Sequence, residues 1–587
     1  MAEDGWLVSN VPLRRVDNLD TLDEVRRWAG ERRQTPVFAD TESAGLQPHR
    51  HAHRLSQLGD MWHGWAFPPA WFGAFNEIVR RHEGLIGFHN SPYDWQVLAV
   101  HQGIEPAWAR TEDTNLLCRL ENSALKADLK GQASRRIDGH ASRAQEELKD
   151  GMRRNGWTWG TVPDTWEPYW RYGALDPVLT AHLWNLHAPM RQLYPMAYDL
   201  ERATARICTN MMMAGMLTDQ PFIREKITEI TAYVEHAQGW LREVHGITNV
   251  NSNAQVAAAF EAAGIPLHVR TEHGNPSFDK DALKVYRFMF PTDAPMIDAI
   301  SWCRKGEGLV GRYLQKFLDM AGPDGVIHYT IKSCQARTTR MSITDPAMQT
   351  FDRDVPLVRG SFIPRPGWVF ITIDADQIEA RLAAHFSNDA NMIAEFRRCD
   401  ELGLKFFIEM ASKIYNEKIS KRDPRYTWTK NATYAQIYGS GLAKAAATAG
   451  VPTIEMEPAY NGLATLYPGV KRLMNRLIWQ GKEGDPKVKI IDGMHLRVTP
   501  GHEYALLNTL IQGSAAVIMK KGLIDLDAAG FGPYLRLVNH DEAILEVPAA
   551  WAEDALRTAT EILTDRTNFR VPITWSGDIL TERWVKT

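Results

Sequence analysis

The sequence predicts an α/β protein of several domains. Its 587 residues exceed what one hydrophobic core accommodates and, at roughly 150 residues per domain, correspond to about three or four compact units. Apolar residues make up 44% and charged residues 24%, proportions that favour dense globular cores over a disordered chain. Short apolar runs typical of strands alternate with longer helical stretches, which indicates sheets covered by helices.

The composition narrows the class of protein. A net charge of −4 does not favour a protein that coats nucleic acid by bulk charge, although it is compatible with a local basic cleft beside an acidic site. The five cysteines are scattered without a CxxC pair, which indicates a reducing compartment and neither a disulfide framework nor a zinc site. Secretion signals and apolar runs of membrane-spanning length are absent. We therefore expect a cytoplasmic protein without membrane contact.

Acids follow the first predicted strand, Pro36–Ala39, in a first domain that alternates strands and helices to about residue 185. The strand's period of two points Asp40 and Glu42 to the same side, where they can share a metal ion. Two more motifs follow, and if the second is helical its two members share a face. These are Asn90 with Asp94, and Tyr172 with Asp176.

Four carboxylates and a phenol suit the hydrolysis of a phosphodiester by two Mg²⁺. That reaction needs hard oxygen ligands at both ions and a group that orients the attacking water. An ordinary strand end, cap or turn could explain any one of these motifs, but it does not account for their joint order. A basic stretch, residues 126–154, is compatible either with a solvated helical face or with contact to a single strand.

Residues from about 200 to 321 are predicted to be mostly helical, with a probable turn and cap at Asn249–Asn253. After them, strand-like pieces return and flank a long helical block from about 391 to 481. The run Val369–Ile373 is an apolar strand that delivers Asp374 at its end. A later apolar segment with a polar tip reads as a β-hairpin that carries Asp541 and Glu542. Acids buried between apolar strands need a compensating cation, and Mg²⁺ is the natural one.

Between these acids, a helix is predicted to begin at an N-cap, Asp423, with Pro424 in its first turn and Gly439 just past its end. Three side chains within it recur every four residues and so share one face. They are Lys430, Tyr434 and Tyr438. An ammonium followed by two rings suits a nucleotide, with charge for phosphate and rings for sugar and base. The alternative is an aromatic stripe facing the core beside a snorkelling lysine.

The order D-x-E, N-x-x-x-D, Y-x-x-x-D resembles the three motifs of the DEDD proofreading exonucleases of the tyrosine-containing subtype. The resemblance implies an RNase H-like fold and 3′→5′ exonuclease activity. It also implies that Tyr172 positions the attacking water, while four acids hold two metal ions: Asp40, Glu42, Asp94 and Asp176.

The later motifs resemble those of family A DNA polymerases of the bacterial DNA polymerase I type. Motif A matches at Asp374 and at Gln377-Ile378-Glu379, motif C at His540-Asp541-Glu542, and motif B from Lys430 to Gly439. The resemblance implies a right-hand polymerase with Asp374 and Asp541 as principal metal ligands and Glu542 as a secondary acid. It implies nucleotide binding by Lys430, Tyr434, Tyr438, Glu379 and Gln377, with Arg425 as a further candidate, and DNA contacts by Arg340, Asn508, Gln512 and His540.

The sequence departs from the family pattern at several positions. The arginine expected four residues before Lys430 is absent, and Arg425 lies one residue earlier, about 100° around the helix. Lys405-Phe406-Phe407 replaces the usual D-x-H, so triphosphate contacts are expected to differ. Tyr504 stands where an arginine is usual. Tyr434, in place of phenylalanine, implies weak discrimination against dideoxynucleotides.

The expected organisation is an exonuclease domain at 1–195, mainly thumb at 196–325, a first part of the palm at 326–390, fingers at 391–485 and a second part of the palm at 486–587. No 5′ nuclease domain is expected. The resemblance implies two Mg²⁺ per active site, with Mn²⁺ as an alternative, and primer–template DNA and dNTPs as partners. A phage replicative enzyme, monomeric and located in the bacterial host cytoplasm, fits best, with a processivity factor, helicase or single-strand-binding protein as further candidate partners.

Three other classes of protein share part of this pattern. A single-subunit phage RNA polymerase shares the palm and the lysine–tyrosine helix, but Glu379 would crowd a ribose 2′-hydroxyl and the exonuclease acids would be unexplained. A nuclease with a degenerate polymerase domain would have lost Asp374, Asp541 or Lys430. A DNA-binding scaffold without activity would need neither set of acids.

Overall fold

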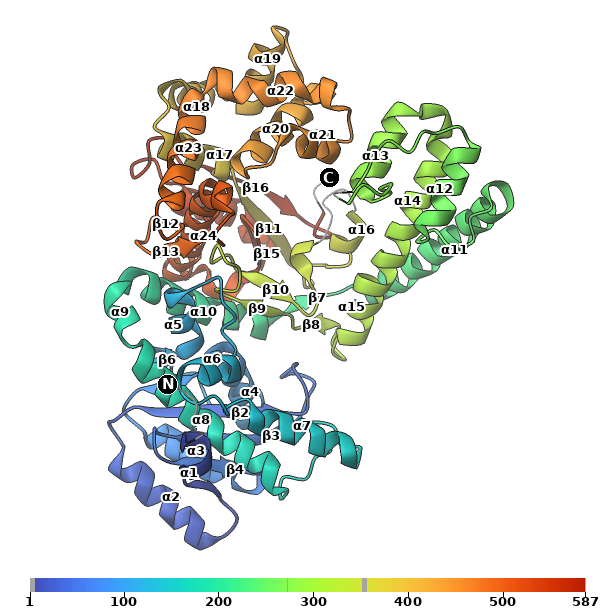
Figure 1. Cartoon of the computed structure of the whole chain (residues 1–587). Helices are drawn as coiled ribbons and strands as arrows, with labels where there is room; N and C mark the ends of the chain where they lie inside the picture. The colour runs from blue at the N-terminus through green and yellow to red at the C-terminus, as the bar shows by residue number, and fades with distance from the viewer. Residues whose placement is uncertain (1–5, 272, 351–355, 586–587) are drawn as a thin grey trace.

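The computed structural model describes residues 6–271, 273–350 and 356–585 (Figure 1). A first domain, blue to teal, lies below a central sheet. Helical lobes stand on either side of that sheet, one green and one orange (Figure 1). The α/β multidomain architecture predicted from the sequence is confirmed. Among the described residues, no helix combines the length and apolar character needed to cross a membrane.

The first domain is built on a mixed sheet of six strands in the order β1-β4-β3-β2-β5-β6. Strand β2 pairs antiparallel with β3 and parallel with β5, so its acids lie in the middle of the sheet. The strands are β1 (Leu13–Arg15), β2 (Val37–Ser43), β3 (His53–Gly59), β4 (Gly64–Phe67), β5 (Ile86–Phe88) and β6 (Thr111–Asp113). The helices are α1 (Trp6–Asn10), α2 (Leu19–Glu31), α3 (Phe72–Arg81), α4 (Ser91–Gln102), α5 (Thr114–Glu121), α6 (Leu129–Arg136), α7 (Arg143–Asn155), α8 (Glu167–His187) and α9 (Pro189–Leu193).

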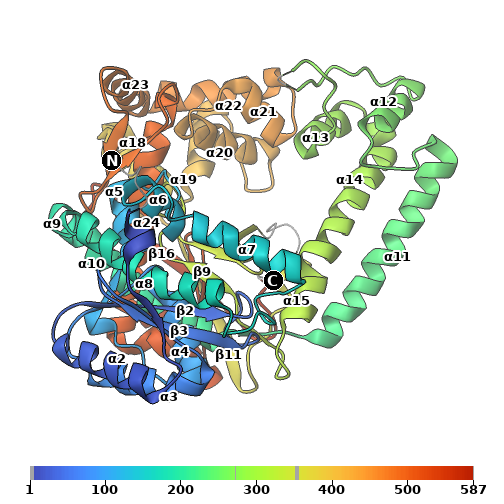
Figure 2. The ribbon, with the colours of Figure 1, turned by 60° about the horizontal axis from the view of Figure 1, so that its bottom comes forward.

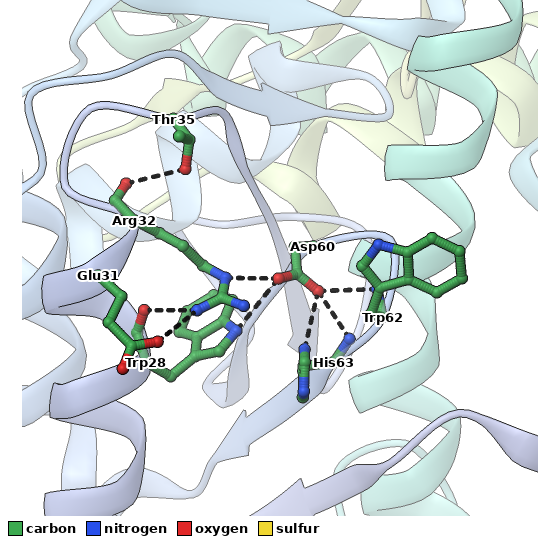
Figure 3. Close-up of polar contacts among 7 residues, drawn as sticks. All are labelled: Trp28, Glu31, Arg32, Thr35, Asp60, Trp62 and His63. Carbon is green, nitrogen blue, oxygen red and sulfur yellow. Dashed lines mark hydrogen bonds and ion pairs between the residues drawn. The ribbon is translucent and has the colours of Figure 1, made fainter.

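Asp60, in the turn between β3 and β4, links this turn to α2 by hydrogen bonds (Figure 3). One carboxylate oxygen accepts the backbone N–H groups of Trp62 and His63, both at 2.7 Å. The other accepts Arg32 Nε at 2.6 Å and Trp28 Nε1 at 3.2 Å. Burial alone would raise the pKa of Asp60, but these backbone and arginine hydrogen bonds outweigh it, so the pKa lies below its usual value.

Replacing Asp60 with alanine should destabilise this edge of the sheet by about 2 to 3 kcal/mol at neutral pH, because two backbone donors and an arginine lose a charged acceptor. Hydrogen exchange of β3, β4 and α2 should rise correspondingly. The folded-state pKa is depressed, so the stabilisation is present above the unfolded pKa and is lost as the pH falls through the folded value. Glu31→Gln is the matched control, because the Glu31 side chain is 74% exposed and should contribute little. Equal exchange in the Asp60 variant and the unmutated protein would contradict the assignment.

Helix α10 (Pro195–Ala214) joins the first domain to the rest of the chain. It packs against α4 and α5 of the first domain and against α24 (Leu506–Leu526). The thumb helices begin at α11 and form the green lobe (Figures 1 and 2). They are α11 (Gln220–His245), α12 (Asn253–Ala262), α13 (Lys280–Met289), α14 (Ala294–Leu309) and α15 (Gln315–Met320).

The palm is an antiparallel sheet in the order β14-β15-β11-β16, with α25 packed against it and α24 in turn packed against α25. Its members are β11 (Trp368–Ala375), β14 (Leu535–Asn539), β15 (Glu542–Pro548), β16 (Trp575–Leu580), α16 (Pro356–Arg359), α17 (Ile378–Ser387) and α25 (Ala552–Leu563). Two-stranded ribbons flank it: β7 (Met216–Leu217) with β8 (Val326–Ile327), β9 (Thr330–Lys332) with β10 (Ser342–Thr344), and β12 (Lys487–Lys489) with β13 (His495–Arg497). Strands β1 and β16 were not predicted from the sequence.

The orange lobe corresponds to the predicted long helical block. Its helices are α18 (Ala390–Leu402), α19 (Phe406–Tyr415), α20 (Pro424–Ile437), α21 (Leu442–Ala449), α22 (Thr453–Leu466) and α23 (Pro468–Lys482). Its tip meets the thumb, where Lys284 Nζ lies 3.4 Å from the carbonyl oxygen of Thr448 and Lys444 pairs with Asp281 at 3.3 Å. The two lobes therefore touch above the palm (Figure 2).

Candidate active sites

The first domain holds an acidic cluster assembled from three elements, β2, α8 and α4. Asp40 and Glu42 project from β2, and Asp176 projects from α8, which packs across β2 and β3. One carboxylate oxygen of each lies within 4.8 Å of the others. Asp94 reaches the same place from α4, where Thr41 Oγ1 donates to Asp94 Oδ1 at 2.7 Å. The four acids predicted from separate motifs thus lie together.

These carboxyls resist ionisation in the absence of a cation. Desolvation raises the pKa of Asp40 to about 7 against the opposing charge of Lys130, and raises that of Glu42 to about 8 with help from Asp40. Burial, followed by the charge of Asp40, holds the pKa of Asp94 well above its usual range. Clustered acids of this kind are stabilised by divalent cations, and oxygen donors suit Mg²⁺ or Mn²⁺. The residues present therefore fit a metal centre.

Lys130 is a member of the cluster that sequence analysis did not identify. It sits in the first turn of α6 and is 6% exposed. Its ammonium forms an ion pair with Asp176 and lies 4.2 Å from the centre of the Tyr172 ring. Desolvation lowers the pKa of Lys130 to about 7, while Asp40 and Glu42 oppose that shift. The basic stretch 126–154 contained this residue, but nothing in its spacing set it apart.

Tyr172 lies one helical turn before Asp176 on α8, as predicted. Its ring is largely buried, and its hydroxyl accepts a hydrogen bond from Gln145 Nε2 at 3.3 Å. Burial, and after it the charges of Glu42 and Asp40, holds its pKa well above the usual value. The hydroxyl consequently stays protonated and remains able to donate a hydrogen bond.

A second pair of acids lies at one end of the palm sheet. Asp374 is near the end of β11, directly across from Glu542 at the start of β15. The predicted hairpin is present, and Asp541 lies in its two-residue turn. The N–H of Ala375 donates to the Asp541 carbonyl oxygen at 3.1 Å, which ties the turn to β11. Asp374 and Asp541 line one cavity of about 320 Å³.

Glu542 is engaged differently from these two acids. Its side chain is buried and forms an ion pair with Arg359 of α16 at 3.1 Å. Arg359 in turn lies 4.6 Å from the centre of the Trp584 ring. Glu542 does not line the cavity that holds Asp374 and Asp541.

Helix α20 forms the opposite wall of the cavity. Its predicted start is confirmed, since the Asp423 side chain accepts the backbone N–H of Arg425 at 2.9 Å. Lys430 and Tyr434 line the cavity. The helix ends before Gly439, which has a φ of +73° and no room for a side chain, because a Cβ added there would lie 2.8 Å from the Tyr504 carbonyl oxygen.

Tyr438 closes α20 beside Glu379 of α17. Its hydroxyl donates to Glu379 Oε2 at 2.6 Å, and Arg340 forms an ion pair with the other oxygen of the same carboxylate. Gln512 of α24 also hydrogen-bonds Tyr438. One hydrogen-bonded network therefore joins three residues that were predicted from separate motifs: Arg340, Glu379 and Tyr438.

The remaining predicted residues lie nearby. Gln377 lines the cavity in a left-handed conformation before α17. Asn508 lies in the first turn of α24, one turn before Gln512. His540 occupies the hairpin turn with a positive φ, and its Nε2 lies 3.2 Å from the Gln349 carbonyl oxygen.

Arg425 points away from the cavity. It pairs with Asp423 at 2.8 Å and with Glu417 at 3.0 Å, and it lies over the Tyr415 ring. Lys405 and Lys421 line the cavity instead. The sequence had flagged Lys405 only as a departure from the usual D-x-H, and no signal singled out Lys421.

A palm sheet with two acids at one end, faced by a helix that carries a lysine and tyrosines, defines the class of nucleic-acid polymerases. The model of DNA polymerase family A matches residues 221–585. This chain belongs to that family, and it is a DNA polymerase.

Some similar proteins cover nearly the whole chain and others only part of it. It is 27% identical to the DNA polymerase of Mycobacterium phage D29, over 94% of each protein. It is 25% identical to DNA polymerase I of Geobacillus stearothermophilus over 70% of this chain and 49% of that protein. Among solved structures, the POL domain of Pol1 from M. smegmatis, in complex with DNA primer-template and dNTP, shares the fold with a TM-score of 0.78 and 19% identity, covering 97% of this chain and 99% of that one.

Proposed function

We propose that this DNA polymerase copies a DNA template and proofreads with its own 3′→5′ exonuclease, in the replication of phage DNA. The observation that carries the proposal is the presence of two acid sets on two separate sheets. The cluster around Asp40 lies on the first domain's sheet, while Asp374 and Asp541 share a cavity with Lys430 on the palm. The similarity to phage D29 DNA polymerase along the chain supports a phage role.

For synthesis, we infer that the primer 3′-hydroxyl attacks the α-phosphate of a paired dNTP in the palm cavity. Two Mg²⁺ held by Asp374 and Asp541, with Mn²⁺ as a substitute, would supply Lewis-acid activation and charge neutralisation. Lys430 would bind the triphosphate and Tyr434 would line the sugar pocket, while the hydrogen-bonded Glu379 and Tyr438 close the side that a ribose 2′-hydroxyl would occupy. Positioning and charge carry the catalysis.

For proofreading, a melted 3′ end would enter the acidic cluster of the first domain. Asp40, Glu42, Asp94 and Asp176 supply oxygen ligands, and the protonated Tyr172 hydroxyl orients the attacking water. Primer–template DNA and dNTPs are the partners that this chemistry requires.

The proposal is tested with a 5′-labelled primer on a longer DNA template in Mg²⁺, with one dNTP, all four, or none. We expect addition only of the dNTP that pairs with the template, shortening from the 3′ end when dNTPs are omitted, and loss of both with EDTA. Extension without any shortening would remove the exonuclease from the proposal. Shortening without any extension would contradict synthesis.

Lys405 and Lys421 should take over part of the triphosphate binding that Arg425, held by its own acids, does not supply. Replacing Lys421 with methionine should raise the KM for dNTP about tenfold with a smaller change in kcat, because a charge-assisted phosphate contact is lost. Lys405→Met should act similarly. Lys418→Met is the control, since Lys418 is exposed in the same segment and does not line the cavity. An unchanged KM in the Lys405/Lys421 double variant would contradict this role.

A further inference from the structure

Lys130 places a positive charge inside the acidic cluster of the first domain. The cluster contains Asp40, Glu42 and Asp176, with Asp94 close enough to interact with Asp40, and the Lys130 ammonium pairs with Asp176. Its side chain is 7% exposed, so it is held among these groups and not in solvent. Lysine is seldom buried unless it is paired or used, because removing an ammonium from water is costly.

The backbone that carries Lys130 is anchored without this ion pair. Ala133 of α6 packs into an apolar cluster with Leu175 and Val178 of α8. Just before the helix, the carbonyl oxygen of Ala127 accepts hydrogen bonds from Asn115 Nδ2 at 3.0 Å and from the His89 ring. Asp128 caps the helix by accepting the N–H of Gly131 at 2.8 Å. The position of α6 is therefore determined by packing and capping, and the buried ammonium is not needed to hold it.

The ammonium also lies beside the group that would orient the attacking water. Lys130 Nζ is 4.2 Å from the centre of the Tyr172 ring, one helical turn from Asp176. A phosphodiester bound between these ligands would bring its non-bridging oxygens to the same place. With Asp176 engaged as a metal ligand, the flexible lysine stem would let the ammonium turn from that carboxylate to the phosphate.

We propose that Lys130 is a further catalytic residue of the exonuclease, and that its ammonium binds the phosphate that is cleaved. The inference rests on the proposed exonuclease function. Water attacks phosphorus, and the bond from phosphorus to the 3′-oxygen of the preceding nucleotide breaks. One water proton passes to that leaving oxygen and the other stays with the new phosphate, which releases it to solvent. The products are a nucleoside 5′-monophosphate and a strand with a free 3′-hydroxyl. Lys130 keeps its proton and balances charge on the non-bridging oxygens.

The test replaces Lys130 with methionine, which keeps the length and apolar stem of the side chain, and compares Lys126→Met, an exposed lysine of the same segment. Single-turnover shortening of a 5′-labelled single strand should fall about 100-fold in Lys130→Met and stay unchanged in Lys126→Met. Lys130→Arg, which keeps the charge, should recover most of the loss. Primer extension serves as the folding control and should be normal in all three variants.

A second measurement separates a phosphate contact from an effect on the metal ligands. Mn²⁺ binding is followed by electron paramagnetic resonance in an Asp374→Asn/Asp541→Asn background, so that the signal reports the first domain. Because Lys130→Met removes a positive charge from the ligands, Mn²⁺ should bind at least as tightly as before. Weaker Mn²⁺ binding together with full activity at saturating Mn²⁺ would overturn the proposal, as would shortening by Lys130→Met within about threefold of the unmutated rate.

These outcomes are distinct from failure of the exonuclease itself. If the unmutated protein does not shorten DNA, the proposed exonuclease is wrong and the role of Lys130 falls with it. If the unmutated protein shortens DNA and Lys130→Met does so equally well, only the role of Lys130 is wrong.

Discussion

Replacing Asp374 with alanine is expected to reduce primer extension by about 1,000-fold or more and to leave shortening of the primer intact. Asp374 and Asp541 line the same cavity from two segments that a backbone hydrogen bond ties together. In the proposed mechanism, removing one acid would take away half of the principal carboxylate ligands of the metal ions, whose charge neutralisation acts mainly in the transition state. The loss should therefore lie in kcat more than in the KM for dNTP.

The Asp374 variant is measured in single-turnover extension at saturating dNTP, beside Asp578→Asn. Asp578 is an exposed acid of β16 in the same sheet and should be replaceable without loss. Extension by the Asp374 variant at more than about a tenth of the unmutated rate would show that this acid is not a principal ligand. If the Asp374 variant lost both shortening and extension, the two domains would depend on one another or the variant would be misfolded.

The second large effect is expected at Asp40. Asp40→Ala should reduce the rate of shortening by about 1,000-fold or more. Extension should continue at the unmutated rate, because Asp40 belongs to the acidic cluster of the first domain and not to the palm. The variant should also retain mismatched primer ends that the unmutated protein removes. Both effects follow from the loss of one carboxylate, since the three remaining acids would bind a metal ion less tightly.

Release of label from a 3′-mismatched primer measures this loss, with Asp150→Ala as the control, since Asp150 of α7 is an exposed acid of the same domain. Asp40 and Asp374 lie on different sheets, so the double variant should lose both activities with no coupling between them. Continued release of the mismatched nucleotide by Asp40→Ala would contradict the assignment of the acidic cluster.

Local patterns identified most of the elements that carry the sites. The strand ending at Asp374, the hairpin with Asp541 in its turn and the capped helix bearing Lys430 were all predicted, because strand alternation, turn chemistry and helix caps act over a few residues. Short strands such as β1 and β16 were missed. Their formation depends on pairing with β4 and β11, which are distant in sequence.

The sequence by itself determined which acids, tyrosines and lysine are the candidates, because their order and local spacing match the motifs that they resemble. Only the tertiary structure decided that Lys130 lies inside the acidic cluster, that Lys405 and Lys421 line the palm cavity while Arg425 pairs with its neighbours, and that Glu542 is held by Arg359. The physical reason is that these contacts join side chains from different elements. The partners of long basic side chains depend on packing and charge in the folded protein, and they cannot be predicted from spacing along the chain.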